Sequence, residues 1–516
     1  MLAKVHSAAL QGLDAQPVIV EVDNFDAGQT AKFTIVGLPD NAVKESQERV
    51  QSALRVNGYK APFKSVVVNL APADMRKEGS GFDLPVAIGV LCSYEFLSID
   101  QPERFMFVGE LGLGGEVLPV KGVLPISIKA RELGYEALFV PEENAREAAV
   151  VNNLKVYGVK HLNEIVGFFS GTTSILPTIV NTREEFYSQL FTFPYDFDEV
   201  KGQENVKRAF EVAAAGGHNI ILVGSPGCGK SMMAKRLPSI LPPLTLGESL
   251  ETTQIHSIAG KLKKEDSLIS QRPFRAPHHT VSDVALVGGG LNPQPGEISL
   301  AHNGVLFADE LPEFSKTTLE VLRQPLEDRR ITISRNKYTL EFPCSFMFVA
   351  SMNPCPCGYY GDRTHNCVCS PGQIQRYMNK ISGPLLDRID IQCEIQPVPF
   401  SDISTTKPGE PSSEIRRRVI AARAIQEERY KDFKEIHCNA QMTESMIHKY
   451  AVPDEAGFRL LSNAMERLSL SARAYSRILK VARTIADLDA SPSVSAQHIA
   501  EAIGYRNLDR GDWAER

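Results

Sequence analysis

Long hydrophobic runs are missing from this sequence. The longest, around residues 84–92, is much shorter than the roughly 20 apolar residues that a membrane-spanning helix requires. The first residues, MLAKVHSAALQGLDAQP, contain neither the apolar core nor the small-residue cleavage site of a secretory leader. We therefore expect no membrane contact and a cytoplasmic location.

The sequence also has few cysteines, and its net charge is not positive. The 516-residue chain has nine cysteines, an odd number that argues against a secreted disulfide framework. Its 56 basic residues are outnumbered by 62 acidic ones, so the formal net charge is −6. This balance excludes a globally basic nucleic-acid binder but allows a local basic surface. The composition, 43% hydrophobic and 23% charged, is otherwise that of an ordinary globular protein of two or three domains.

The hydrophobic pattern divides the chain into regions. Residues 1–170 alternate short β-branched runs with helical ones, which predicts a mixed α/β domain. A polar stretch, 171–197, is interpreted as a linker, and 198–398 has the buried strands and glycine-rich loop of a parallel α/β core. Residues 399–516 carry only helical patterns. Strands are predicted at 32–36, 65–70, 105–108 and 137–140, and helices at 40–56, 122–132, 416–430, 443–450, 454–467, 472–489 and 495–503.

A phosphate-binding loop follows the first strand of the core. Residues 224–231, GSPGCGKS, fit the pattern G-x-x-x-x-G-K-[ST], with an apolar strand before and a helix after. Backbone N–H groups of such a loop surround phosphate oxygens, and the helix N-terminus adds its dipole. Lys230 would reach the β- and γ-phosphates of ATP, and the Ser231 hydroxyl would bind Mg²⁺. The predicted binding residues are Gly224, Ser225, Pro226, Gly227, Cys228, Gly229, Lys230 and Ser231.

Polar residues end two further apolar strands of the core. Asp309 and Glu310 follow the run 304–308; Asp309 would hold Mg²⁺ through water and Glu310 would polarise the attacking water. Asn353 follows 346–350 and could sense the γ-phosphate. The alternatives are a strand cap with two solvated acids and an ordinary turn asparagine.

Two arginines are candidates for stabilising charge on the transferred phosphoryl group. Arg388 lies in the segment GPLLDRID, between a helix and an apolar strand, and Arg473 opens a predicted C-terminal helix. Surface ion pairs are the alternative for each.

Taken together, these motifs resemble those of AAA+ ATPases. The segments RAPHH (275–279), VGGG (287–290), PGEISLAHNG (295–304) and RQPLED (323–328) are similar to those of the magnesium-chelatase-like AAA+ proteins of the ComM/YifB family. The resemblance implies a hexameric ring, Asn353 as sensor 1, Arg473 as sensor 2, and Arg388 as an arginine finger acting on a neighbouring subunit's ATP.

The long interval between Lys230 and Asp309 leaves room for an insertion. Residues 275–298 resemble the helix-2 insert of this AAA+ branch, and His278 and His279 within it are interpreted as structural. Residues 329–342 read as a β-hairpin, an element that lines the ring pore in relatives. Its basic residues could follow a nucleic-acid backbone, or the hairpin could simply be solvated; they are Arg329, Arg330, Arg335 and Lys337.

Four cysteines lie in one short loop, as two C-x-C pairs. Four thiolates can close a tetrahedral site, which suits structural Zn²⁺. Reduced thiols and a redox disulfide are the alternatives. The cysteines are Cys355, Cys357, Cys367 and Cys369.

The N-terminal region resembles Lon-protease-like domains, of the ribosomal S5 domain 2-like α+β fold, in three segments, 76–85, 109–122 and 137–144. Active Lon-like domains use a Ser–Lys dyad, but Gly81 stands at the serine position and Leu124 at the lysine position. Neither can act as nucleophile or base. The resemblance therefore implies an inactive protease domain that serves as a scaffold.

The fold class expected is thus α/β: a Lon-like domain, an AAA+ core and an all-α lid. The favoured function is an ATP-driven hexameric motor on DNA that promotes branch migration in natural transformation, as the family resemblance implies. Alternatives are an ATP-driven protein remodeller or magnesium-chelatase-type ATPase, an ATP-dependent protease, and a non-enzymatic scaffold. The chelatase motor is expected to lack a Lon-like domain, the protease is opposed by Gly81 and Leu124, and the scaffold by intact Lys230, Asp309 and Glu310.

Overall fold

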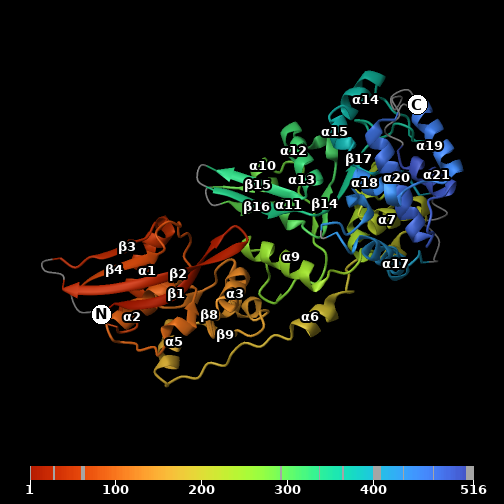
Figure 1. The fold of residues 1–516 in the computed structure, drawn as a ribbon. Coiled ribbons are helices and arrows are strands. Elements are labelled where there is room, and N and C mark those ends of the chain that lie inside the picture. The colour runs from red at the N-terminus through yellow and green to blue at the C-terminus, as the bar shows by residue number, and fades with distance from the viewer. Residues whose placement is uncertain are drawn as a thin grey trace. The chain divides into compact units, whose positions relative to one another are not determined.

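The computed structural model describes residues 2–26, 30–59, 64–290, 293–335, 338–362, 365–398, 408–433, 435–468 and 470–506. The chain forms two compact units (Figure 1). Unit 1 comprises Met1–Gln189 and Leu246–Ser270, and unit 2 comprises Leu190–Thr245 and Gln271–Arg516. Within the described residues, no helix is both long enough and apolar enough to cross a bilayer.

Unit 1 is built on a seven-stranded mixed sheet of order β3-β4-β2-β1-β5-β8-β9. Two long strands, β1 and β2, form an antiparallel hairpin in which Val5 faces Val20, and both side chains are buried. Helix α2 is apolar nearly all round and packs on this hairpin, so the sheet and helix share one core. The elements are β1 (Ala3–Gln11), β2 (Asp14–Asp26), β3 (Phe33–Val36), α1 (Asn41–Val56), β4 (Lys64–Ala71), α2 (Asp83–Ser93), β5 (Phe105–Phe107), β6 (Glu110–Leu111), β7 (Val117–Leu118), α3 (Val123–Glu132), β8 (Ala137–Pro141), α4 (Ala145–Ala148), β9 (Lys155–Val159), α5 (Leu162–Phe169), α6 (Thr182–Gln189) and α9 (Leu246–Ile258).

Helix α9 groups with unit 1, although its residues lie within the range 198–398 that the sequence analysis assigned to the ATPase core. It packs against α3, where Ser257 donates a hydrogen bond to Glu147 and accepts one from the Gly122 N–H at 3.1 Å. Burial raises the pKa of Glu147, against the effect of its four hydrogen-bond donors. The side chain therefore fastens the segment that leaves unit 2 after Thr245 and returns to it at Gln271.

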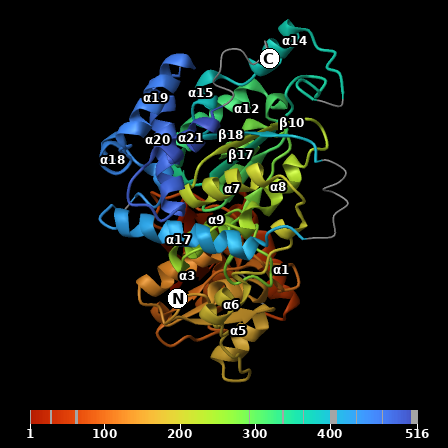
Figure 2. The ribbon, with the colours of Figure 1, turned by 90° about the vertical axis from the view of Figure 1, so that its right-hand side faces the viewer.

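Unit 2 contains a five-stranded parallel sheet of order β11-β14-β17-β10-β18. Its inner strands are apolar except for Ser351 in β17, because both faces of a parallel sheet are covered. Helix α7 lies between the sheet and the C-terminal helices α17 and α20 (Figure 2). The elements of this unit, up to the last strand of the sheet, are α7 (Glu204–Gly216), β10 (Ile220–Gly224), α8 (Lys230–Arg236), β11 (Phe274–Arg275), α10 (Asp283–Val287), β12 (Gly288–Gly289), β13 (Gln294–Pro295), α11 (Glu297–Leu300), β14 (Val305–Ala308), α12 (Lys316–Val321), α13 (Arg323–Asp328), β15 (Arg330–Arg335), β16 (Tyr338–Pro343), β17 (Met347–Met352), α14 (Pro371–Met378), α15 (Gly383–Leu386) and β18 (Ile391–Ile395).

The C-terminal part of unit 2 is helical, as the sequence predicts. Two of its helices are capped by the side chains of Asp454 and Ser471, each of which accepts a hydrogen bond from a backbone N–H of the first turn. The helices are α17 (Ser412–Tyr430), α18 (Glu444–Tyr450), α19 (Glu455–Arg467), α20 (Ala472–Leu488) and α21 (Ala496–Gly504).

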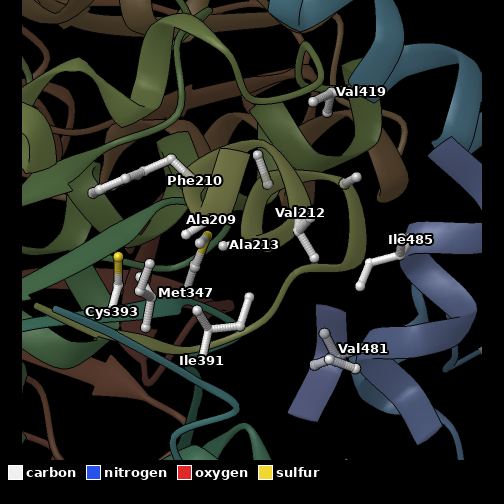
Figure 3. Packing of buried hydrophobic residues seen from close by; sticks show 14 of the residues in the cluster. Ala209, Phe210, Val212, Ala213, Met347, Ile391, Cys393, Val419, Val481 and Ile485 are labelled. Carbon is white, nitrogen blue, oxygen red and sulfur yellow. The ribbon is translucent and has the colours of Figure 1, made fainter. Parts of the chain in front are cut away.

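One hydrophobic core joins this helical part to the sheet. Figure 3 shows Phe210 and Val212 of α7 with Ile391 of β18 on one side and Val481 of α20 on the other. All four side chains are essentially inaccessible to solvent. Truncating a buried phenylalanine such as Phe210 to alanine typically costs about 3–5 kcal/mol. The core therefore holds the helical part firmly against α7 and the strands that carry the site.

Candidate functional site

The phosphate-binding loop lies between β10 and α8. Gly227 and Gly229 adopt φ of 78° and 94°, in the left-handed region that favours glycine. At Gly224 a Cβ atom would stand 2.4 Å from the Ile395 carbonyl oxygen, so no side chain fits there. These glycines leave the loop backbone free to close around an anion at the N-terminus of α8.

The Lys230 ammonium group sits within this loop. It donates to the carbonyl oxygens of Gly224 at 2.7 Å and Ser225 at 3.0 Å, and to Asn353 Oδ1 at 3.1 Å. Asn353 follows β17, the strand next to β10. The structure therefore brings the predicted phosphate-binding lysine and the predicted sensor asparagine into direct contact.

A serine and an aspartate next to this lysine offer oxygen ligands for a divalent cation. Ser231 Oγ donates to Asp309 Oδ2 at 2.8 Å, and Ser351 of β17 donates to the other carboxylate oxygen. Hydroxyl and carboxylate oxygens are the ligands that Mg²⁺ prefers. Ser351 was not predicted; its only signal is that it is a polar residue near the end of an otherwise apolar strand.

Glu310 takes a different direction from its neighbour Asp309. Its backbone has φ of 53°, and its N–H lies 3.3 Å from Ser351 Oγ. Its carboxylate is 58% exposed and lies 3.7 Å from Nδ1 of His279, a residue that sequence analysis treated as structural.

Arg388 lies at the opposite end of the strands from the phosphate loop. Its carbonyl oxygen accepts from the side chain of Asn219 at the start of β10, whereas Gly224 at the end of β10 pairs with Ile395. Five residues of strand separate the two ends, about 16 Å at roughly 3.3 Å per residue. Arg388 therefore cannot reach a phosphate bound by its own chain. Its guanidinium contacts Glu327 and the Pro384 carbonyl oxygen.

Arg473 is placed beside Arg388 rather than beside Lys230. It opens helix α20 and donates to Asp387 Oδ2 at 3.2 Å, one residue before Arg388. Its side chain is 67% exposed. The two predicted arginines therefore occupy the same end of the sheet, away from the loop that would bind phosphate in the same chain.

A buried polar network supports this arginine-bearing turn. Asp390 accepts from Arg477 of α20 at 2.5 Å, and its other oxygen faces His218 Nδ1 at 3.3 Å. His218 Nε2 lies 2.8 Å from Thr484 Oγ1, again on α20. The network connects the turn, the segment that leads into β10, and the C-terminal helices.

The four loop cysteines lie together. Every pair of their sulfur atoms is within 4.8 Å, and the separations from Cys355 are 3.3 Å to Cys357 and 3.7 Å to Cys367. A tetrahedral site with Zn–S bonds of about 2.3 Å places sulfur atoms about 3.8 Å apart. Desolvation raises the pKa of the Cys357 thiol, but hydrogen bonds from the amides of Tyr359 and Val368 outweigh this effect and lower the pKa to about 6. The donor set and its spacing therefore fit Zn²⁺.

This cysteine loop borders the phosphate site. Cys355 comes two residues after Asn353, and Gly358 packs so closely on Pro226 that a Cβ atom there would lie 2.6 Å from the proline ring. The loop thus follows Asn353 directly and is in contact with the loop 224–231.

The predicted hairpin is confirmed as β15 and β16, paired in antiparallel register. Arg330 forms an ion pair with Glu341 at 2.8 Å, and Arg329 donates to Ser345 Oγ. Arg335 ends β15, and Lys337 lies outside the described residues.

In unit 1, the positions aligned with the Lon dyad are lined by apolar side chains. A Cβ atom at Gly81 would contact Val108 and Val120, and Leu124 is completely buried. The Leu124 N–H donates to Glu147 Oε1 at 3.0 Å. Neither position offers a nucleophile or a base.

The fold and the site of unit 2 are those of a P-loop ATPase of the AAA+ class. The chain belongs to the magnesium-chelatase-like family that includes the competence protein ComM. Residues 196–403 match the family described as magnesium chelatase, subunit ChlI, residues 409–506 match its C-terminal family, and residues 20–144 match the family described as subunit ChlI of Mg-chelatase.

Two relatives align over nearly their whole length. ComM of Haemophilus influenzae is 43% identical over 510 residues, which cover 99% of this chain and 98% of ComM. The YifB protein of Salmonella typhimurium is 42% identical over 512 residues, with the same coverage. A shorter match links 96 residues, 18% of this chain, to 20% of the DNA repair protein RadA of Listeria monocytogenes at 31% identity.

Another partial match concerns a protease. Lon protease 2 of Bacillus subtilis is 26% identical over 162 residues, 29% of this chain and 28% of that protein. The match of residues 20–144 to a family described as a chelatase subunit removes one argument of the sequence analysis, because an N-terminal domain of this kind no longer separates this chain from chelatase motors.

Proposed function

We propose that this chain is an ATP-hydrolysing ring motor that acts on DNA in the cytoplasm, a hexamer that promotes branch migration during natural transformation or recombination. The observation that carries the ring is the split of the site. Lys230 and Asp309 lie at one end of the sheet and Arg388 at the other. A complete site therefore requires two chains, and a closed ring completes all of them.

Each residue of the shared site has a distinct task. The glycine loop and Lys230 bind the phosphates of ATP, and Lys230 exchanges its present oxygen partners for phosphate oxygens. Ser231 and Asp309 hold Mg²⁺, which neutralises charge on the phosphates. Glu310 polarises the attacking water, and Asn353 orients it.

The two arginines act on the nucleotide of a neighbour. Arg388 leaves Glu327 to stabilise negative charge that develops on the γ-phosphoryl group. Arg473 is anchored to the same turn through Asp387, so it approaches the same neighbouring nucleotide.

The cysteine loop holds structural Zn²⁺. Four clustered thiols supply the whole tetrahedral ligand set, so the metal has no open position for catalysis. Its effect is to stiffen a loop that contacts Pro226 and follows Asn353.

The DNA-binding role is supported by the relatives and by the hairpin. ComM is named for competence and RadA for DNA repair. Arg330 is already neutralised by Glu341, so Arg335 and Lys337 are the hairpin residues we assign to phosphate contacts. Unit 1, with no dyad at Gly81 and Leu124, serves as a Lon-like scaffold rather than a protease. An ATP-driven protein remodeller of the chelatase type is the second candidate, because three parts of the chain match chelatase families.

The decisive experiment measures ATPase activity with single-stranded, duplex and four-way-junction DNA. We expect stimulation that is tolerant of sequence and weakens steeply with salt. Replacing Arg335 and Lys337 together by alanine should reduce stimulation and spare the basal rate. Arg330→Ala is the matched control on the same hairpin, and should have little effect because its charge is already paired. An ATPase that no DNA stimulates would favour the remodeller instead.

A further inference from the structure

Helix α17 buries only one side of its surface. Ile415, Val419 and Ala422 are almost completely buried, and this side of the helix packs against α7 and α20. The whole length of α17 is visible in Figure 2, at the surface of unit 2. The contacts with α7 and α20 therefore account for the inner face of the helix and leave its outer face without a partner in unit 2.

The outer face has an apolar centre. Ile420 and Ile425 are 37% and 38% exposed, and Ala421 and Ala424 lie exposed between them. At about 3.6 residues per turn these four positions fall on one side of the helix. The two alanines allow another helix to approach closely, and the isoleucines can pack on either side of it. This face therefore has the shape that a second helix requires.

Charged residues flank the apolar centre at both ends. Glu414 and Arg417 precede it, and Glu428 and Lys431 follow it, at intervals that keep them on the same side of the helix. Each side chain is more than half exposed. The ion pairs they form lie within the helix, with Arg417 at 3.1 Å from Glu414 and Lys431 at 2.6 Å from Glu428. These charges are therefore accessible to a partner.

The apolar centre is complementary to itself in the antiparallel direction. A two-fold axis between positions 422 and 423 places residues at equal distances from it opposite each other in two copies of the helix. Ile420 then faces Ile425 of the second copy, and Ala421 faces Ala424. The large and small side chains of one helix thus match those of the other, and the two alanine pairs meet at the centre of the contact.

The same axis brings opposite charges together at both ends. Arg417 faces Glu428 of the second copy, and Glu414 faces Lys431. With the ion pairs inside each helix, each end of the contact becomes a square of alternating charges. A parallel pair of helices would instead place Arg417 against Arg417 and Glu428 against Glu428, and like charges in contact disfavour an interface. The charges therefore select two identical helices in antiparallel order.

We propose that the outer face of α17, residues 414–431, joins two copies of this chain about a two-fold axis. Such a contact is complete after two copies, so it cannot extend around a ring. In the ring proposed above it joins one ring to another, which goes beyond the function proposed there. One pair of helices buries less than the roughly 1,600 Å² of a typical stable interface, so a single contact is weak. Several contacts between the same two rings act together and hold them firmly.

The test is the mass of the full-length protein in solution at low salt, with an ATP analogue that is not hydrolysed. Wild type should sediment as paired rings. Arg417→Glu and Glu428→Arg should each sediment as single rings of half that mass, because each variant places like charges opposite each other. An equal mixture of the two variants should recover paired rings, since the carboxylate introduced in one faces the guanidinium introduced in the other.

The matched control is Arg459→Glu on α19, which reverses an exposed arginine that is likewise in an ion pair within its own helix. It should pair as wild type does. High salt should separate wild-type rings, because the contact depends on exposed charges. The ATPase activity of the single rings should equal that of wild type, since α17 carries no residue of the nucleotide site.

The outcomes separate this contact from the proposed ring. Wild type that never exceeds the mass of one ring overturns the contact, and so do single variants that pair as wild type does or a mixture that recovers nothing. Single variants that form no ring at all would place this face inside the ring, which also overturns the proposal. If wild type is instead a dimer that each variant abolishes and the mixture restores, the ring fails and the two-fold contact stands.

Discussion

Replacing Asp390 by asparagine should destabilise unit 2 strongly, although the substitution hardly alters side-chain volume. The carboxylate is 1% exposed and accepts from Arg477 at 2.5 Å, from His218 at 3.3 Å and from the Asn219 N–H at 3.2 Å. Removing one member of a buried ion pair leaves the other charge uncompensated and costs about 3–5 kcal/mol. We expect Asp390→Asn to lose stability in that range.

Local stability is the quantity to measure, because two units make a single global transition ambiguous. Amide hydrogen exchange of peptides from β10, β18 and α20 reports the opening of this network directly. The double variant Asp390→Asn/Arg477→Met should lose less than the sum of the single losses, since it leaves no unpaired charge. A change below about 1 kcal/mol in Asp390→Asn would refute the reasoning.

The network also predicts the direction of the pH dependence. Burial opposes ionisation of Asp390, but Arg477 and His218 outweigh it and hold the pKa of this carboxyl well below its usual range. Its stabilising effect is therefore present above its unfolded pKa of about 3.9 and is lost as pH falls further. Burial lowers the pKa of His218, so the unfolded chain binds a proton below about pH 6.5 that the folded chain does not. Both groups make unit 2 less stable in acid. The protection of the amides against exchange, relative to the intrinsic rate at each pH, should therefore change less between pH 5 and 3 in Asp390→Asn than in wild type.

Two further predictions concern the shared site and the metal. Arg388→Ala should abolish ATP hydrolysis while ATP affinity stays largely intact. Mixing this variant with Lys230→Ala chains should recover some ATPase activity, because each chain supplies the residue that the other lacks. Mixed rings without any recovery would contradict action of Arg388 on a neighbour's nucleotide. Elemental analysis of the purified protein should find about one Zn²⁺ per chain. Replacing Cys355 and Cys367 by serine should remove the metal and weaken the ATPase activity. A metal-free protein of full activity would contradict the metal site.

The local elements were largely predictable from the sequence. The loop 224–231 and the strand before Asp309 have patterns that depend only on neighbouring residues, and the structure confirms a buried strand, a glycine loop and a helix there. Capping side chains such as Asp454 also mark helix starts within a few residues. The long β1–β2 hairpin was missed, because nothing in its alternation distinguishes it from other amphipathic runs until the partner strand is known.

Contacts between distant segments that no motif marks were not predictable. Ser351 matters because β17 adjoins β14, and His279 because β11 adjoins β14 on the other side. Neither neighbour can be read from spacing along the chain. The assignment of α9 to unit 1 has the same cause, since its partner Glu147 lies about a hundred residues earlier in the sequence.

In the ring proposed above, the geometry of unit 2 would give a physical reason for coupling between chains. Asp390 is fixed to His218 at the entry to β10, and β10 ends in the phosphate-binding loop. The same carboxylate is fixed to Arg477 on α20, whose first turn carries Arg473. A force on Arg388 from a neighbour's nucleotide would therefore act on a rigid, buried network rather than on a free loop. Such a network would transmit the displacement to the strand that positions Lys230 and to the C-terminal helices. Each ATP site in a ring would therefore respond to whether the neighbouring ATP site is occupied.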